Sequence, residues 1–204
     1  MASPNDRTSS VSTRNSSRAL PIDGPKITNI VCGVNLNCRF ELKTIALYGR
    51  NVTYYPKKFN AAIIRMREPK ATALVFQTGK MQVLGAKSVD DAKLAARKFA
   101  RMLQKMGFSP RMEGFNVQNI VAVVDTKMII RLEKLHHDHY VYSRWEPELF
   151  PGLVYRFHES KVKALVFTTG KVVLLGSKQE EQLDECIKLL YPVLNECRVI
   201  EQNK

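Results

Sequence analysis

The side chains in this chain that most obviously could bind a metal or react are a histidine cluster and four cysteines. In the segment His136–His139 three imidazoles surround Asp138, and both kinds of side chain can ligate a metal ion. Three close histidines without a second cluster of ligands are more typical of a solvated turn, so we expect no metal site. The sequence shows no paired carboxylates and no nucleophile with an adjacent base. It therefore predicts neither an enzyme nor a bound cofactor.

The cysteines are spaced for neither a redox motif nor zinc. They show no CxxC pairing and no zinc-finger spacing, which favours buried, reduced thiols of a cytosolic or nuclear protein. They are Cys32, Cys38, Cys186 and Cys197.

The sequence offers instead a repeat that sets basic residues in matched pairs. The segment 59–87 aligns without gaps on 150–178, an offset of 91 residues, and fourteen of the 29 positions are identical. The matched basic pairs include Arg65 with Arg156, Lys80 with Lys171 and Lys87 with Lys178. A period of about 90 residues is too long for a solenoid, whose repeats run about 20–50 residues. It predicts two copies of a domain-sized unit with a nearly twofold-symmetric surface, which suits duplex DNA.

Composition and charge support a nucleic-acid partner. Lys and Arg outnumber Asp and Glu by 32 to 19, a net charge of +13, and apolar residues make up 45% of the chain. The basic excess favours a polyanion, and no apolar run approaches the ~18 residues of a transmembrane helix. Residues 1–24 are rich in Ser, Thr and Arg and lack the apolar centre of a signal peptide, which predicts a disordered tail. The two repeats then occupy residues 25–113 and 114–204.

Each repeat is predicted to be an α+β unit that ends in one long helix. Apolar residues recur at helical spacing from Ala92 to Met106 and, 91 positions later, from Leu183 to Cys197. Pro192 should kink the second helix. Gly79 and Gly170 should form tight turns between strands. The predicted strands are 27–34, 59–66, 72–77 and 80–84, then 117–124, 152–157, 163–168 and 171–175, and a short helix is predicted at 42–48.

The predicted strands are apolar on both faces. Ala73 and Val75 alternate with Leu74 and Phe76, whereas a sheet covered on one face alternates apolar and polar residues. One long helix per repeat cannot cover both faces, so we expect a large apolar face to remain open, as binding sites do. A third covering layer or a homodimer through the sheet would also explain the pattern.

Six segments resemble the TATA-box-binding protein family of general transcription initiation factors. They are 42–47, 73–81, 85–88, 94–98, 146–153 and 191–194, and the resemblance covers residues 26–200. It implies a saddle of two pseudo-symmetric repeats, with one curved antiparallel sheet of about ten strands and helices on the convex face. The family is itself the established example of minor-groove binding with kinked DNA, and that binding mode is inferred from the resemblance alone.

The resemblance also implies a DNA-binding surface. Phenylalanine pairs wedge between base steps at each end, two asparagines hydrogen-bond bases near the centre, and Arg, Thr and Lys pairs reach phosphates. The apolar floor favours A·T pairs because G·C adds a protruding amine. The first-repeat residues are Asn29, Val31, Phe59, Arg65, Leu74, Phe76, Thr78, Lys80 and Leu84. Those of the second repeat are Asn119, Val121, Phe150, Pro151, Arg156, Leu165, Phe167, Thr169, Lys171, Val173 and Leu175.

The chain departs from the family pattern at the centre of this surface. Leu84 and Leu175 stand where the family typically carries threonines that donate hydrogen bonds to bases. An A·T preference is still expected, but its strength and the preferred site are open. Asn60 and Gln82 replace small or apolar residues, which implies that the two halves grip DNA unequally.

The two long helices differ in charge. Residues 87–105 carry six basic and two acidic side chains, a net +4, whereas residues 178–198 carry three basic and five acidic ones, a net −2. Different protein partners can explain such an asymmetry. By resemblance, the basic helix meets regulators that block or remove the protein, or upstream DNA; the loop at 146–149 meets transcription factor IIB, and the first-repeat edge meets transcription factor IIA. The implied partner residues are Lys87, Lys93, Arg97, Lys98, Arg101, Lys105, Glu146, Glu148 and Leu149.

Together these features predict a nuclear promoter-recognition factor that binds and kinks TATA DNA and nucleates assembly of the transcription machinery. The alternative is a paralogue of the same fold that acts mainly as a protein adaptor with weak TATA preference. The four retained phenylalanines disfavour the adaptor, whereas Leu84 and Leu175 favour it. The open apolar face should also allow homodimerisation without DNA. No membrane association is expected.

Overall fold

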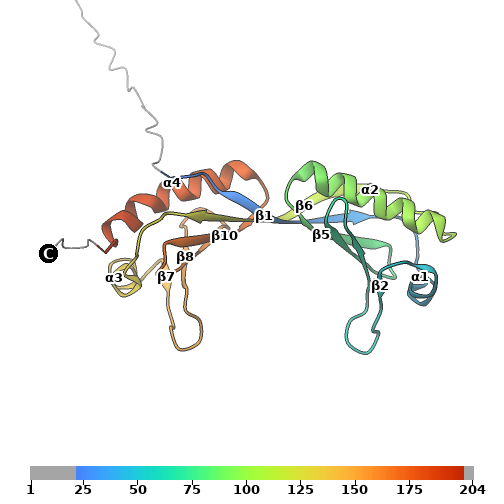
Figure 1. Cartoon of the computed structure of the whole chain (residues 1–204), viewed down its shortest axis with the longest axis horizontal. Coiled ribbons are helices and arrows are strands. Elements are labelled where there is room, and N and C mark those ends of the chain that lie inside the picture. Colours follow the sequence, from blue (N-terminus) through green and yellow to red (C-terminus); the bar gives the residue numbers. More distant parts are fainter. Residues whose placement is uncertain (1–21, 200–204) are drawn as a thin grey trace, which may run out of the picture.

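Both halves of the chain contribute to one continuous sheet. The computed structural model describes residues 22–199, and the sheet has ten antiparallel strands (Figure 1). The first half supplies β1 (Lys26–Asn35), β2 (Val52–Thr53), β3 (Ala62–Met66), β4 (Ala71–Val75) and β5 (Lys80–Ala86). The second half supplies β6 (Glu113–Asp125), β7 (Ser143–Arg144), β8 (Leu153–Arg156), β9 (Lys163–Val166) and β10 (Lys171–Ser177). The order β2-β3-β4-β5-β1-β6-β10-β9-β8-β7 sets β1 beside β6 at the pseudo-twofold axis.

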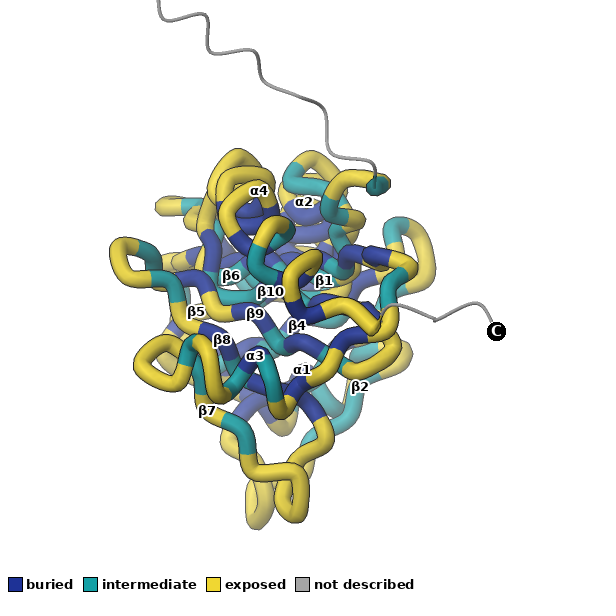
Figure 2. Tube along the Cα trace, turned by 90° about the vertical axis from the view of Figure 1, so that its left-hand side faces the viewer, coloured by how far each residue is buried: buried dark blue, intermediate teal, exposed yellow. Residues whose placement is uncertain are grey.

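The helices lie on one side and at the ends of this sheet. α2 (Val89–Lys105) and α4 (Glu180–Glu196) cover the convex side, while the short α1 (Leu42–Tyr48) and α3 (Leu132–Asp138) lie at the two ends (Figure 1). Seen from one end of the saddle, α4 at the near end and α2 at the far end both lie above the strands, and the loops β2–β3 and β7–β8 project below (Figure 2). No helix or strand within residues 22–199 covers the concave side. The predicted saddle and its open face are thus confirmed.

Burial of alternate strand residues explains how the two apolar faces are used. In β4, Ala71, Ala73 and Val75 are buried beneath the helices, whereas Thr72 and Leu74 are half-buried on the concave side. Each long helix contributes the predicted buried stripe. In α2 it comprises Ala92, Ala95, Ala96, Phe99, Ala100 and Leu103, and in α4 Leu183, Cys186, Ile187, Leu190 and Leu194. The convex face of the sheet is therefore the core, and its concave face is left to solvent.

Local sequence signals start the long helices. The Ser88 hydroxyl caps α2 by accepting a hydrogen bond from the Asp91 amide at 3.1 Å, and Asp90 and Asp91 sit favourably at the positive end of the helix dipole. α4 begins with Glu180 and Glu181, again acidic. Pro192 lies inside α4, which continues to Glu196.

The predicted strand at 59–66 was too long at its start. The amides of Lys58 and Phe59 both donate to the Tyr55 carbonyl, at 3.0 and 2.9 Å, so this segment forms a turn and β3 begins only at Ala62. Phe59 therefore lies on the projecting β2–β3 loop. Strand periodicity could not separate it from β3, because the flanking residues are equally compatible with an extended chain.

The cysteines are free thiols within the fold, three of them buried. Cys32, Cys186 and Cys197 are buried free thiols, and burial raises the pKa of the Cys32 thiol to about 11. Cys38 is a half-buried free thiol. Within residues 22–199 no three His, Cys, Asp or Glu side chains gather closely enough to hold a metal ion.

The histidine cluster is engaged in local hydrogen bonds. His136 Nδ1 lies 2.9 Å from the Ser143 hydroxyl, and His137 Nδ1 lies 3.0 Å from an Asp138 oxygen. The latter bond lowers the pKa of the exposed Asp138 carboxyl.

Within residues 22–199 no helix is long and apolar enough to cross a membrane.

Candidate nucleic-acid interface

The centre of the concave face holds two asparagines that are fixed in positions related by the pseudo-twofold axis. Asn29 on β1 pairs with Val121 on β6, and Asn119 on β6 pairs with Val31 on β1. The Asn29 Oδ1 accepts the amide of Gly85 at 2.8 Å, and the Asn119 Oδ1 accepts that of Gly176 at 2.8 Å. Both side-chain amide groups are therefore oriented by the backbone, and their NH₂ groups remain available as donors.

Two β-bulges make these anchoring bonds available. Val31 pairs with Leu84 and Ile30 with Ala86, so Gly85 between them has no partner on β1. Gly85 has φ +99°, a backbone conformation that residues other than glycine rarely adopt. Gly176 occupies the equivalent bulge of β10, with φ +100°. In both repeats the glycine that follows the unusual leucine thus fixes the asparagine.

An apolar floor surrounds the central amides. Leu84 lies across from Val31, and Leu175 lies across from Val121, all four half-buried on the concave side. Farther out, Leu74 of β4 and Leu165 of β9 continue the floor in each repeat, and Val173 joins it in the second. The structure thus brings together the apolar residues that the sequence assigned to this surface.

A pair of phenylalanine rings stands at each end of the floor. The ring centroids of Phe59 and Phe76 are 6.1 Å apart, and those of Phe150 and Phe167 are 5.9 Å apart, in edge-to-face contact. Phe59 and Phe150 expose 43% and 41% of their surface, a large fraction for phenylalanine in a folded domain. Such exposed paired rings can insert between base steps.

Turns and loops set the four rings in place. Phe76 follows β4 directly, and the Gly79 amide donates to its carbonyl at 3.1 Å to close the turn into β5. Phe167 and Gly170 repeat this turn at 2.9 Å. Gly79 and Gly170 have φ of +93° and +79°, which confirms their predicted role in tight turns.

Gly152 is a contributor that sequence reasoning missed. A Cβ atom on it would lie 2.7 Å from the Phe150 ring and 3.0 Å from the Phe167 ring. The absence of a side chain therefore leaves room for these two rings at the positions they occupy. Comparison of the repeats contains the signal, because Gly152 aligns with the small Ala61.

Polar and cationic side chains surround the floor. Arg65, Thr78 and Lys80 in the first repeat are exposed, as are Arg156, Thr169 and Lys171 in the second; the apolar Pro151, next to Phe150, is also exposed. The Arg65 guanidinium also donates to the Thr53 hydroxyl at 3.1 Å, which steadies it at the end of β3. A concave apolar floor inside a basic rim suits the sugars and phosphates of a DNA groove.

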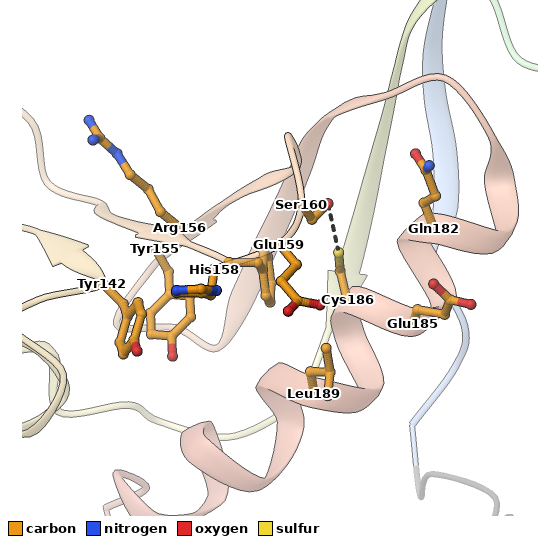
Figure 3. A pocket seen from close by; sticks show the side chains of 11 residues that line it. Tyr142, Tyr155, Arg156, His158, Glu159, Ser160, Gln182, Glu185, Cys186 and Leu189 are labelled. Atoms are coloured by element: carbon orange, nitrogen blue, oxygen red, sulfur yellow. Dashed lines mark hydrogen bonds between the residues drawn. The ribbon is translucent and has the colours of Figure 1, made fainter.

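A separate hollow of about 520 Å³ lies on the outer side of the second repeat, between β8 and α4 (Figure 3). Tyr142, Tyr155 and His158 form one side, and Glu185 and Leu189 of α4 form the other. Burial raises the pKa of the Tyr155 hydroxyl. Arg156 also borders this hollow, but its guanidinium points away from the other lining side chains (Figure 3). This hollow is therefore distinct from the concave surface.

The residues expected to meet protein partners are exposed on the other surfaces. They are Lys87, two residues before α2, and Lys93, Arg97, Lys98, Arg101 and Lys105 within α2. Leu149 is 81% exposed on the β7–β8 loop between Glu148 and Phe150, and Glu146 pairs with Arg144 at 2.8 Å. Lys98 donates to the Glu68 carbonyl at 2.8 Å, which ties α2 to the β3–β4 turn.

Comparison with known proteins agrees with this geometry. The family described as "Transcription factor TFIID (or TATA-binding protein, TBP)" matches residues 24–106 and 114–197. The chain is 54% identical to the TATA-box-binding protein of Schizosaccharomyces pombe over 174 residues, which are 85% of this chain and 75% of that protein. It is 53% identical to the TATA-box-binding protein of Saccharomyces cerevisiae over 174 residues, 85% of this chain and 72% of that protein.

A plant protein and an archaeal structure extend the comparison. TATA-box-binding protein 1 of Arabidopsis thaliana is 50% identical over 178 residues, 87% of this chain and 89% of that protein. The solved structure of Methanococcus jannaschii TBP superposes with a TM-score of 0.75 at 32% identity, covering 85% of this chain and 99% of that one. With both repeats matched and the same saddle found in a solved structure, this chain belongs to the TATA-box-binding protein family.

Proposed function

We propose that this chain is a nuclear general transcription factor that binds TATA promoter DNA in the minor groove, kinks it and nucleates assembly of the transcription machinery. The observation that carries the proposal is the concave face itself. Two anchored amides lie at its centre, an apolar floor extends on both sides, and an exposed phenylalanine pair stands at each end. The family is one of non-enzymatic DNA-binding factors, and the work of the protein is to bind and deform DNA.

Each part of the surface has a role in that deformation. Unstacking a base step costs a few kcal/mol, which is offset by contact with the wedging rings and by the larger area that bent DNA presents to the floor. The NH₂ groups of Asn29 and Asn119 donate to the N3 and O2 acceptors of the minor groove. These acceptors are present at A·T pairs without the amine that guanine adds, so the floor favours A·T.

A binding and bending measurement tests the proposal. An A·T-rich duplex labelled at both ends should show increased energy transfer when the protein binds, because kinking shortens the end-to-end distance. A G·C-rich duplex of the same length, at the same salt concentration, controls for phosphate contacts. Equal affinity for both duplexes, without bending of either, would refute the proposal and favour a protein adaptor.

The leucines beside the centre should weaken discrimination against G·C there. Apolar contacts discriminate weakly, whereas a hydrogen-bonding group left unpaired by the wrong base costs free energy. Leu84→Thr with Leu175→Thr should therefore increase the discrimination by up to about 1–3 kcal/mol per position, while affinity for the A·T duplex need not rise. Titration of both proteins with an A·T duplex and with one carrying central G·C pairs measures the difference. A wild type that already rejects G·C as strongly as the double variant would contradict this role of the leucines.

The same open face should cause self-association when DNA is absent. We expect dimers in sedimentation equilibrium at roughly 10–50 µM protein, the range of weak contacts, and monomers bound to DNA when a TATA duplex is added. Because the net charge of +13 opposes association, raising the salt concentration should strengthen the dimer by screening. A protein that stays monomeric at low and high salt would show that the concave face is stable in water alone.

Protein partners are proposed for the faces that DNA leaves free. The exposed β7–β8 loop, with Leu149 at its tip, would meet transcription factor IIB, and the first-repeat edge at β2 would meet transcription factor IIA. The basic face of α2 would meet acidic regulators that block or remove the protein, or upstream DNA. Charge complementarity supports this division because α2 and α4 carry opposite net charge.

A further inference from the structure

The two halves of the concave face differ in one row of residues. The row crosses the sheet one step outward from the central asparagines, on the side of each phenylalanine pair. In the first half it runs Ile63, Leu74, Gln82, Gly33 and Asn116. In the second half the equivalent row runs Val154, Leu165, Val173, Val123 and Lys26. The first half thus carries a glutamine and a glycine where the second carries two valines.

The glycine makes room for a second glutamine. Gln118 occupies the bulge of β6 between Val117 and Asn119, and its Nε2 lies 2.4 Å from the point where a Cβ on Gly33 would be. A side chain at position 33 would displace this amide. At the equivalent point of the second half the side chain of Val123 would exclude a glutamine in the same way. A hollow of about 450 Å³ opens here, bordered by Gly33, Phe76, Gln82 and Gln118 among others.

The two glutamines are paired with each other. The Gln82 Nε2 donates to the Gln118 Oε1 at 3.3 Å, which leaves the Gln82 Oε1 free to accept and the Gln118 Nε2 free to donate. In the second half, Val173 replaces Gln82 and Thr28 replaces Gln118, and the Thr28 hydroxyl donates instead to the Val121 carbonyl at 3.2 Å. A free acceptor beside a free donor is therefore found at this row in the first half.

A G·C pair shows the complementary pattern in the minor groove. Guanine offers its N2 amine as a donor beside the N3 acceptor, whereas A·T offers acceptors only. We propose that the Gln82–Gln118 pair accepts a G·C pair between the first-repeat kink and the centre of the site, and so makes the preferred site asymmetric. The Gln82 Oε1 accepts from the guanine amine, and the Gln118 Nε2 donates to N3 or to the cytosine O2. The inference rests on the proposed minor-groove binding.

A palindromic duplex turns this asymmetry into a measurement without fixing the orientation of the protein. One G·C pair is introduced at each position of a palindromic A·T site in turn, and then a second at the symmetry-related position. The full chain can turn its first repeat toward a single G·C pair, so the first change should cost little affinity at the responsive position. The second change places G·C beneath Val173 and should weaken binding on the order of tenfold.

Two variants and a control identify the residues. Gln82→Val copies the second half and should make the first G·C pair as costly as the second, and Gln118→Ala should do the same by removing the partner of Gln82. Val173→Ala trims the floor in the other half; it should weaken binding to all duplexes by a similar factor and preserve the difference between the first and second changes.

The outcomes separate this inference from the proposed function. A wild-type protein that binds the A·T palindrome but loses equal affinity at the first and second changes at every position overturns the inference and leaves minor-groove binding intact. Retained tolerance in Gln82→Val also overturns it. Failure to bind the unaltered palindrome more tightly than a G·C duplex would instead overturn the proposed function, and the inference with it.

Discussion

Replacing Phe150 and Phe167 together by alanine should remove one of the two kinks and leave the other in place. The centroids of these rings are 5.9 Å apart. The pair lies at one end of the concave face, with Phe59 and Phe76 at the other. TATA-box-binding proteins are known to kink DNA by about 80°, a value taken from the family. We expect the double variant to reduce that bend by about half.

The loss of binding free energy should be smaller than the contribution of the wedge contacts alone. Burial of a phenylalanine contributes about 1.5–3 kcal/mol, so a wedging pair contributes up to about 6 kcal/mol. Unstacking the step costs a few kcal/mol, and this cost disappears when the wedge is gone. The net loss should therefore be on the order of tenfold to a hundredfold in affinity. Energy transfer between the DNA ends gives the bend, and titration at constant salt gives the affinity.

Matched variants complete this experiment. Phe59→Ala with Phe76→Ala should have a similar effect at the opposite end. Leu189→Ala removes a side chain that is 68% exposed on α4, away from the concave face, and should alter neither bend nor affinity. Thermal unfolding checks that the variants fold. An unchanged bend in the folded Phe150 and Phe167 variant would show that these rings do not act as wedges.

The fold could be predicted largely because the same pattern of strands and helix occurs in both repeats. The buried stripe of α2 reappears 91 positions later in α4, and the strands before each helix align in the same way. The lack of alternation between apolar and polar residues in β4 also predicted the open face. Leu74 and Val75 point to opposite faces of the sheet, and both are apolar. Patterns of this kind depend on burial alone, which the sequence records directly.

The features that sequence reasoning missed depend on contacts between distant segments. The bond from Gly85 to Asn29 spans 56 residues and exists only because a bulge leaves the Gly85 amide unpaired. Likewise, the room above Gly33 matters only because the β6 bulge directs Gln118 toward it. Neither bulge has a periodic signature. Register shifts follow from the packing of the whole sheet, and they decide which polar groups of the concave face remain free.

The second large effect is expected at the central asparagines. Replacing Asn119 by aspartate keeps the shape of the side chain and keeps an oxygen to accept the Gly176 amide, now 2.8 Å from the Asn119 Oδ1. The anchoring bond and the bulge should therefore survive. Alanine would be a poorer test, because it would leave the Gly176 amide without its partner and mix a change in folding with a change in binding.

The substitution reverses the chemistry of the outward atom. The NH₂ group of Asn119 donates, and the carboxylate that replaces it can only accept, opposite the N3 and O2 acceptors of the bases. An unsatisfied buried acceptor costs about 1–3 kcal/mol, more when it is charged, so Asn119→Asp should weaken binding to an A·T duplex by about a hundredfold. Asn29→Asp should act similarly from the other repeat.

The change in net charge needs its own control, because one added negative charge alone weakens binding to DNA. Asn195→Asp makes the same chemical change at an exposed position of α4, on the convex side. Its effect on affinity should be small and should shrink further at higher salt, since screening weakens the interaction between distant charges. The effect of Asn119→Asp should persist at higher salt because the acceptors are in direct contact. Equal losses for Asn119→Asp and Asn195→Asp would mean that the central amide does not donate to the bases and that the Gly176 bond serves only the fold.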